Sequence, residues 1–182
     1  MWPLRGQCLN NSMAQTQFIA PSTVTQTAGT DTVGWDLDAG MTPRTQDGNC
    51  CGTTEPLRAV SMTSGLTGQR QTHMLLWGGW DLGSVTGTVN GMELRVYAEK
   101  SSRVRDSVIQ LYRNGSLIGA NRADSTAGDD HVYGSSTDTW GTALTPADLQ
   151  TLQVAVSYQS GAMPHSDHAY VDTVQLRITY TP

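Results

Sequence analysis

The sequence predicts an all-β fold, an antiparallel β-sandwich preceded by a short N-terminal arm. Apolar and polar residues alternate most regularly in Met92–Ala98, Leu152–Tyr158 and Val174–Tyr180. A period of two indicates that one face of each strand is buried, as in antiparallel sheets that pack on each other. No segment keeps a helical period over two turns or more. Charged residues make up only 15% of the chain, and the threonine, serine and glycine that replace them suit strands and turns.

Length and charge exclude several classes of protein. A chain of 182 residues is expected to form one domain, which buries roughly 70% of its unfolded surface without help from disulfides or metals. The formal net charge of -5 argues against a nucleic-acid partner, because such binding needs a basic patch. We find neither a signal peptide nor a run of about 20 apolar residues. We therefore expect no membrane partner.

The cysteines predict free thiols. Cys8, Cys50 and Cys51 are odd in number and include an adjacent pair, which is a poor framework for disulfides. No cysteine pair has the spacing of a zinc site. We therefore expect assembly in a reducing cytoplasm.

Two features indicate contact surfaces. Residues 1–18 are polar and aperiodic but carry Trp2, Leu4 and Phe18, so we interpret them as an arm that docks on a neighbour, with residues 19–182 forming the sandwich domain. Lys100 is the only lysine, and all other basic residues are arginine. Arginine is favoured in interfaces because its planar fork pairs bidentately and stacks. A high genomic GC content would explain the same bias.

The first half of the chain contains fewer strand signals than the second. Ile19–Thr30 and Pro56–Ser61 are expected to contain strands, and His73–Leu82 is expected to be a buried strand with a bulge at its paired glycines. Asp36–Glu55 and Ser64–Thr72 are interpreted as turns and loops.

The second half contains clearer strand and turn signals. Val89–Ala98 is a predicted strand, and Ile109 and Leu111 belong to the next one. Asn114 and Gly115 supply the left-handed positions of a type I′ hairpin turn, which returns into Leu117 and Ile118.

Several residues are expected to have structural roles. Tyr133 opens the run YGSSTDTWG, in which Gly134 and Asp138 are typical of a sharp turn. Trp140 would then fill the open end of the sandwich. In TPADLQ, Thr145 would cap one short helical turn that holds Pro146 and Asp148. Asp172 precedes the last strand and is placed to accept main-chain amides from a nearby turn.

Four segments together resemble a known family. They are LYRNGSLIGANRA (Leu111–Ala123), YGSSTDTWG (Tyr133–Gly141), TPADLQ (Thr145–Gln150) and AYVDTVQLRITY (Ala169–Tyr180). In order and spacing they resemble a β-sandwich domain of bacteriophage virion proteins and some bacterial surface proteins. The resemblance covers a little over half of the chain and implies a jelly-roll-like sandwich. The first 70 or so residues match weakly, and the cysteine-bearing insertion before His73 departs from the family pattern.

The candidates for chemistry are sparse. His165 and His168 flank Asp167, but two ligands on one short loop need further partners to hold a metal. Asp124, Asp129, Asp130 and His131 share a loop that lacks the spacing of a calcium site. No serine or cysteine lies in a nucleophile motif. We therefore expect no enzymatic activity, no cofactor and no metal.

The resemblance implies a virion structural protein, most simply a capsid decoration or cement protein that stabilises the particle through subunit contacts. Its expected partners are the major capsid protein or other virion proteins, and it would form a homo-oligomer, a dimer or trimer. It would be located in the virion after assembly in the host cytoplasm.

The alternative is a tail-fibre or adhesin module that binds a receptor or carbohydrate. Trp77, Trp80, Tyr97 and Tyr112 would supply an aromatic platform for a sugar. The competing interpretation is that these aromatic side chains face the core.

Overall fold

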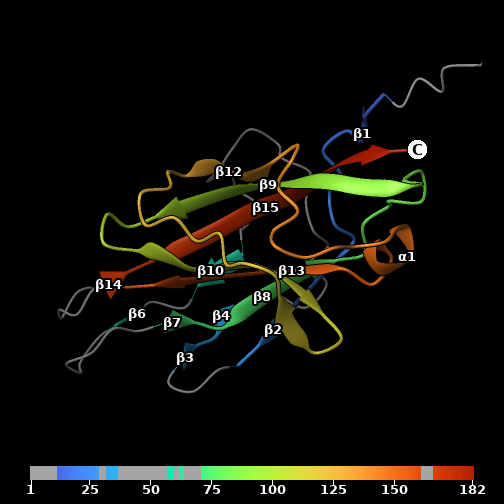
Figure 1. Cartoon of the computed structure of the whole chain (residues 1–182). Helices are drawn as coiled ribbons and strands as arrows, with labels where there is room; N and C mark the ends of the chain where they lie inside the picture. Colours follow the sequence, from blue (N-terminus) through green and yellow to red (C-terminus); the bar gives the residue numbers. More distant parts are fainter. Residues whose placement is uncertain (1–11, 29–31, 37–56, 60–61, 64–70, 161–165) are drawn as a thin grey trace, which may run out of the picture.

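Two β-sheets pack face to face in this protein and enclose one hydrophobic core (Figure 1). The computed structural model describes residues 12–28, 32–36, 57–59, 62–63, 71–160 and 166–182. The paired strands of both sheets are antiparallel, except for one short parallel pair between β3 and β7. The prediction of an all-β sandwich is therefore confirmed.

The strands are short in the first half of the chain and long in the second. Their bounds are β1 Ala14–Gln15, β2 Thr23–Thr27, β3 Thr32–Val33, β4 Trp35–Asp36, β5 Leu57–Ala59, β6 Met62–Thr63, β7 Gln71–Thr72, β8 Met74–Gly78, β9 Thr88–Lys100, β10 Arg105–Arg113, β11 Ser116–Ile118, β12 Asp130–Ser135, β13 Gln153–Gln159, β14 Ser166–Asp167 and β15 Ala169–Thr181. One helical turn, α1, spans Pro146–Leu149.

The six-stranded sheet has the order β12-β9-β15-β5-β4, with β1 also paired to β15. Its centre is the long β9–β15 pair, in which Leu94 lies opposite Leu176 and Met92 opposite Ile178. These four side chains are fully buried. The residues between them point outward, so the predicted alternation places one face of this sheet in the core.

The seven-stranded sheet has the order β11-β10-β13-β7-β3, with β8 also paired to β13 and β2 paired to β8. Strand β13 lies inside this sheet and is buried on both faces from Val154 to Tyr158. The chain crosses between the sheets after β9, because β9 belongs to one sheet and β10 to the other.

Several local predictions match the structure. Asn114 and Gly115 have φ angles of 51° and 83°, as a type I′ turn requires, and β11 follows them. Thr145 caps α1 with its side chain, and Pro146 begins the helix. Trp140 is fully buried within the core.

Other predictions differ from the structure. Gly134 lies in a strand, β12, rather than in a turn. The paired glycines form no bulge, because β8 ends at Gly78 and Gly79 turns the chain with a φ of 69°. Asp172 lies within β15, at an irregularity in its pairing with β9 between Val171 and Thr173, rather than before the strand.

No helix in the described part of the chain is long and apolar enough to cross a membrane.

Candidate functional site

The N-terminal segment lies along β15 on the side opposite β9, near the C-terminal end of the strand. Ala14 and Gln15 form β1 and pair with Tyr180 and Thr179. The Thr16 main-chain N–H donates to the Ile178 carbonyl at 2.9 Å, and the Ile178 N–H donates to the Thr16 hydroxyl at 3.0 Å. The segment therefore extends the six-stranded sheet by main-chain pairing.

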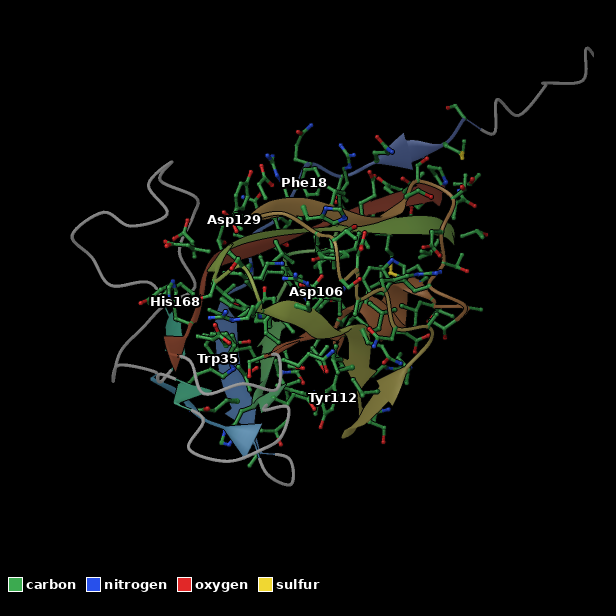
Figure 2. The ribbon with its side chains drawn as sticks, turned by 90° about the vertical axis from the view of Figure 1, so that its left-hand side faces the viewer. Phe18, Trp35, Asp106, Tyr112, Asp129 and His168 are labelled. Carbon is green, nitrogen blue, oxygen red and sulfur yellow. The ribbon has the colours of Figure 1, made fainter. Side chains whose placement is uncertain are left out.

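The same segment adds little to the hydrophobic core. Within the described residues, the first side chain that packs against the core is Ile19. Met13 is 61% exposed, and Phe18 lies half-buried on the outside of the sheet (Figure 2). Trp2 and Leu4, the other predicted interface residues, lie outside the described residues.

Phe18 contacts an ion pair on the outer face of the six-stranded sheet. The Arg177 guanidinium lies 4.4 Å from the centre of the Phe18 ring. Arg177 also binds both carboxylate oxygens of Glu93, at 2.8 and 2.7 Å. The segment is thereby joined to β15 and β9 by a stacking contact as well as by main-chain pairing.

A second arginine repeats this arrangement on the same face. Arg95 binds both oxygens of Asp130 at 2.9 and 2.6 Å, and its guanidinium lies 4.4 Å from the Tyr97 ring centre. The hydrogen bond from Arg95 holds the pKa of Asp130 below its ordinary value. Val132, opposite Arg95 on β12, is 41% exposed. Exposed ion pairs add little stability, but stacked, paired arginines beside apolar side chains are typical of contact surfaces.

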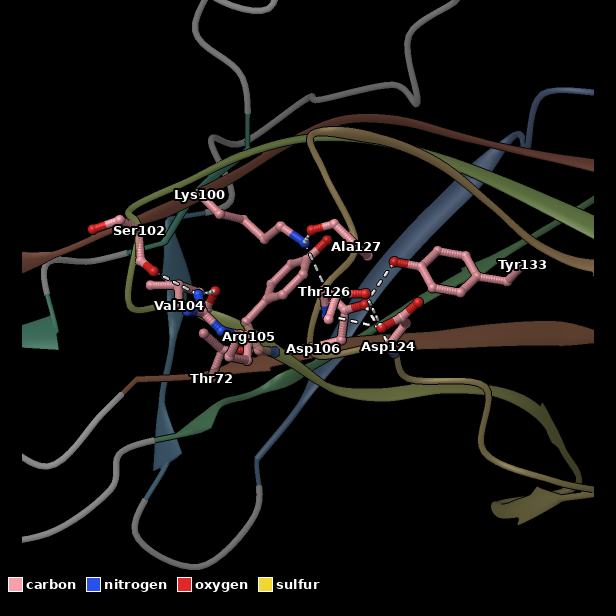
Figure 3. A network of polar contacts seen from close by, with 11 residues as sticks. Thr72, Lys100, Ser102, Val104, Arg105, Asp106, Asp124, Thr126, Ala127 and Tyr133 are labelled. Atoms are coloured by element: carbon pink, nitrogen blue, oxygen red, sulfur yellow. Dashed lines mark hydrogen bonds and ion pairs between the residues drawn. The ribbon is translucent and has the colours of Figure 1, made fainter.

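A polar network lies between the two sheets. The Lys100 ammonium is 2.9 Å from Asp106 Oδ1, and the two side chains are 7% and 0% exposed. Lys100 also donates to the Ala127 carbonyl at 3.1 Å. Asp106 Oδ2 accepts hydrogen bonds from the Tyr133 hydroxyl at 2.7 Å and the Asp124 N–H at 3.2 Å (Figure 3).

Tyr133 is held as a proton donor in this network. Burial, followed by the negative charge of Asp106, raises the pKa of Tyr133 well above its ordinary value. Burial also raises the pKa of Tyr158, whose ring centre lies 5.3 Å from the Lys100 ammonium. Both phenols therefore stay neutral, and the Tyr133 hydroxyl donates its proton to the hydrogen bond with Asp106.

The described residues next to His165 make contacts with other parts of the chain. His168 Nδ1 lies 3.0 Å from the Ser101 hydroxyl, and its Nε2 lies 3.8 Å from Glu99. Asp167 lies 3.6 Å from Arg103, and His165 lies outside the described residues. No three metal-ligating side chains come together in the part of the chain that the structure describes.

The acidic loop is likewise occupied by its own contacts. Asp124 accepts hydrogen bonds from the main chain and hydroxyl of Thr126. Asp130 binds Arg95, and the His131 ring lies 4.7 Å from the Tyr133 ring. Asp124 and Asp130 therefore bind groups within the chain.

The aromatic platform of the adhesin alternative is not on the surface. Trp77, Trp80 and Tyr97 are at most 6% exposed, and Tyr112 is half-buried. The competing interpretation, that these side chains face the core, is correct for Trp77 and Trp80. Tyr97 is instead buried on the outer face of the six-stranded sheet, where the Arg95 guanidinium covers its ring.

The predicted structural residues sit in local hydrogen-bond networks. Asp138 Oδ1 accepts from the Trp140 main chain at 2.8 Å and pairs with Arg122. The Trp140 indole N–H donates to the Met92 carbonyl at 3.0 Å. Asp148 accepts from the Thr145 N–H at 2.9 Å and pairs with Arg113. These contacts hold the connection from β12 through α1.

The sequence interpretation missed both the Lys100–Asp106 pair and the Arg177–Glu93 pair. The only signal in the sequence for the Lys100–Asp106 pair was that Lys100 is the only lysine. Comparison with known proteins adds no family to this description, because no family model, no curated protein and no solved structure matches the chain.

Proposed function

We propose that this protein is a structural component of a bacteriophage virion, of the capsid decoration or cement type. The observation that carries the proposal is the N-terminal segment, which pairs with the edge of β15 while contributing no residue before Ile19 to the described core. A segment of this kind is suited to linking a folded domain to neighbouring subunits.

The outer face of the six-stranded sheet supports the same role. Its two arginines are paired, stacked and flanked by Phe18 and Val132. Such a face suits extended packing on other protein subunits, where many weak contacts add together. The proposed partners are the major capsid protein or other virion proteins, with the chain itself forming a dimer or trimer.

Binding to particles tests the proposal. We expect Phe18→Ala, made in the full chain, to reduce co-sedimentation with particles that lack the protein. Leu117→Ser is the matched control, because Leu117 is 39% exposed on β11 of the other sheet. Equal binding by both variants and the unmodified chain would count against the proposal.

The receptor-binding alternative is left with little support. Three of its four aromatic residues are buried. A glycan array on the full chain separates the two functions, since a cement protein is expected to bind no glycan.

A further inference from the structure

We propose that Lys100 and Asp106 form an intramolecular amide bond that joins the two sheets covalently. Lys100 ends β9 in the six-stranded sheet, and Asp106 lies at the start of β10 in the seven-stranded sheet. Lys100 Nζ lies 2.9 Å from Asp106 Oδ1, and both side chains are shielded from solvent. This modification goes beyond the proposed virion role and does not rest on it.

The two oxygens of Asp106 have different surroundings. Oδ1 faces the lysine nitrogen, whereas Oδ2 accepts hydrogen bonds from the Tyr133 hydroxyl and the Asp124 N–H (Figure 3). When an amine adds to a carboxyl carbon, negative charge develops on the oxygen that remains. Two donors already directed at Oδ2 stabilise that charge without rearrangement.

The two reacting groups lie in a site shielded from solvent. Two charges in a dry interior carry a large desolvation cost, and a proton transfer from the ammonium to the carboxylate removes both charges. The neutral amine that results is the nucleophilic form of lysine. The strands hold the two groups in contact, so the reaction needs no encounter step.

The reaction balances without a co-reactant. Lysine Nζ forms a bond to Asp106 Cγ, and the bond from Cγ to Oδ1 breaks. Oδ1 leaves as water with two of the three ammonium protons, and the third proton stays on the amide nitrogen. No electrons are exchanged, and one neutral amide replaces two buried charges.

Trypsin digestion of the denatured full chain, followed by mass spectrometry, tests the proposal. A linked Lys100 resists trypsin, so residues 96–103 and 106–113 are expected as one species, lighter than the two separate peptides together by one water. The intact protein is expected to be lighter than its sequence by the same amount. Cleavage after Lys100, which releases residues 96–100 separately from residues 106–113, would overturn the proposal.

One control concerns a different source of the same mass loss. Asp47 precedes Gly48, and an aspartate in that position can lose water by cyclising onto its own main chain. A water loss located at these residues, with Lys100 still cleaved, would also overturn the proposal. The digest therefore decides between the two sites.

Three variants test the assigned roles. Lys100→Met removes the nucleophile and is expected to abolish the water loss at Asp106. Tyr133→Phe removes one donor to Oδ2 and is expected to lower the linked fraction at a fixed time after synthesis. Arg177→Met removes the ion pair with Glu93 and the contact with Phe18, both on the outer face, and is expected to leave the link unchanged. If Lys100→Met does not fold, the digest of the unmodified chain still decides the proposal.

Discussion

Trp140 combines a strained main chain with a fully buried ring. Its φ angle is 56°, in the left-handed region, which costs an L-residue roughly 1–2 kcal/mol. The ring lies in the core, and its indole N–H binds the Met92 carbonyl. Burial of this large side chain offsets the strain, so the side chain rather than the local backbone preference determines the conformation.

Trp140→Ala is expected to lower the free energy of unfolding by about 3–5 kcal/mol, because it removes a large buried side chain and leaves a cavity. Urea unfolding followed by circular dichroism measures this loss. Trp140→Phe, which keeps an aromatic ring but not the donor to Met92, is expected to cost less. A loss below about 1 kcal/mol for the alanine variant would contradict the placement of the ring in the core.

We expect the stability of the protein to depend on pH through Asp148. Hydrogen bonds from Thr145 hold the pKa of Asp148 below its ordinary value of 3.8. Its stabilising effect is therefore fully present above pH 3.8 and is lost as the pH falls through the lower folded-state pKa. We expect Asp148→Asn to be less stable than the unmodified chain at neutral pH, with the difference narrowing in acid.

Urea unfolding at a series of pH values checks this expectation. Asp81→Asn, at an exposed carboxylate, is the control and is expected to change stability little at any pH. A stability difference for Asp148→Asn that does not depend on pH would contradict the assigned hydrogen bonds.

At the residue scale, the sequence predicted the roles that depend on local chemistry. Asn114, Gly115 and the Thr145 cap were predicted because turn and cap preferences act over a few residues. The pairing of Lys100 with Asp106 was not, because it requires the chain to cross between the sheets after β9. Local patterns do not indicate such a crossing.

The hairpin between β10 and β11 is a single element whose turn depends on one glycine. Its turn places Gly115 at a φ of 83° with nothing within 4 Å of an added Cβ. Gly128 has equally open space without a positive φ. Because neither position is crowded, a comparison of the two glycines measures the effect of the left-handed backbone conformation alone.

Gly115→Ala is expected to destabilise the protein by about 1–2 kcal/mol, the cost of the left-handed region for an L-residue. Gly128→Ala is expected to be close to neutral. Thermal unfolding of the two variants measures the contrast. Equal effects would show that the turn tolerates a side chain and is not of type I′.

Strands were predicted where alternation was strong and missed where it was weak. Strands β9, β13 and β15 follow from their period of two. Strand β12 was missed because Gly134 and Ser135 are typical turn residues. It forms because β9 offers an edge for pairing, and Gly134 is needed there because an added Cβ would lie 2.3 Å from the Met92 carbonyl oxygen.

At the scale of the whole molecule, the hydrophobic core and the N-terminal segment are held by different kinds of contact. The core of the described residues needs no side chain before Ile19. The segment instead adds main-chain hydrogen bonds along β15 and the contact of Phe18 with Arg177. Composition predicted an arm that docks on a neighbour. The described part of the segment pairs instead with β15 of its own chain, and an aperiodic segment carries no signal for that partner strand.

Deletion of residues 1–18 is expected to leave a folded domain. The loss in the free energy of unfolding is expected to be on the order of 1–3 kcal/mol, because a few exposed hydrogen bonds are lost at about 1 kcal/mol each. Circular dichroism and urea unfolding measure the outcome. An unfolded product would mean that the segment is an integral strand of the core.

We infer that the protein has a structural role in the virion and that this role depends on residues 1–18. The most direct test is to count this chain in purified particles assembled with the full protein and with the deleted form. We predict a copy number comparable to that of the major capsid protein, and its loss on deletion of the segment. The proposed structural role would be contradicted if the chain were absent from particles or present at a copy number typical of a tail component. Undiminished binding after the deletion would contradict it as well.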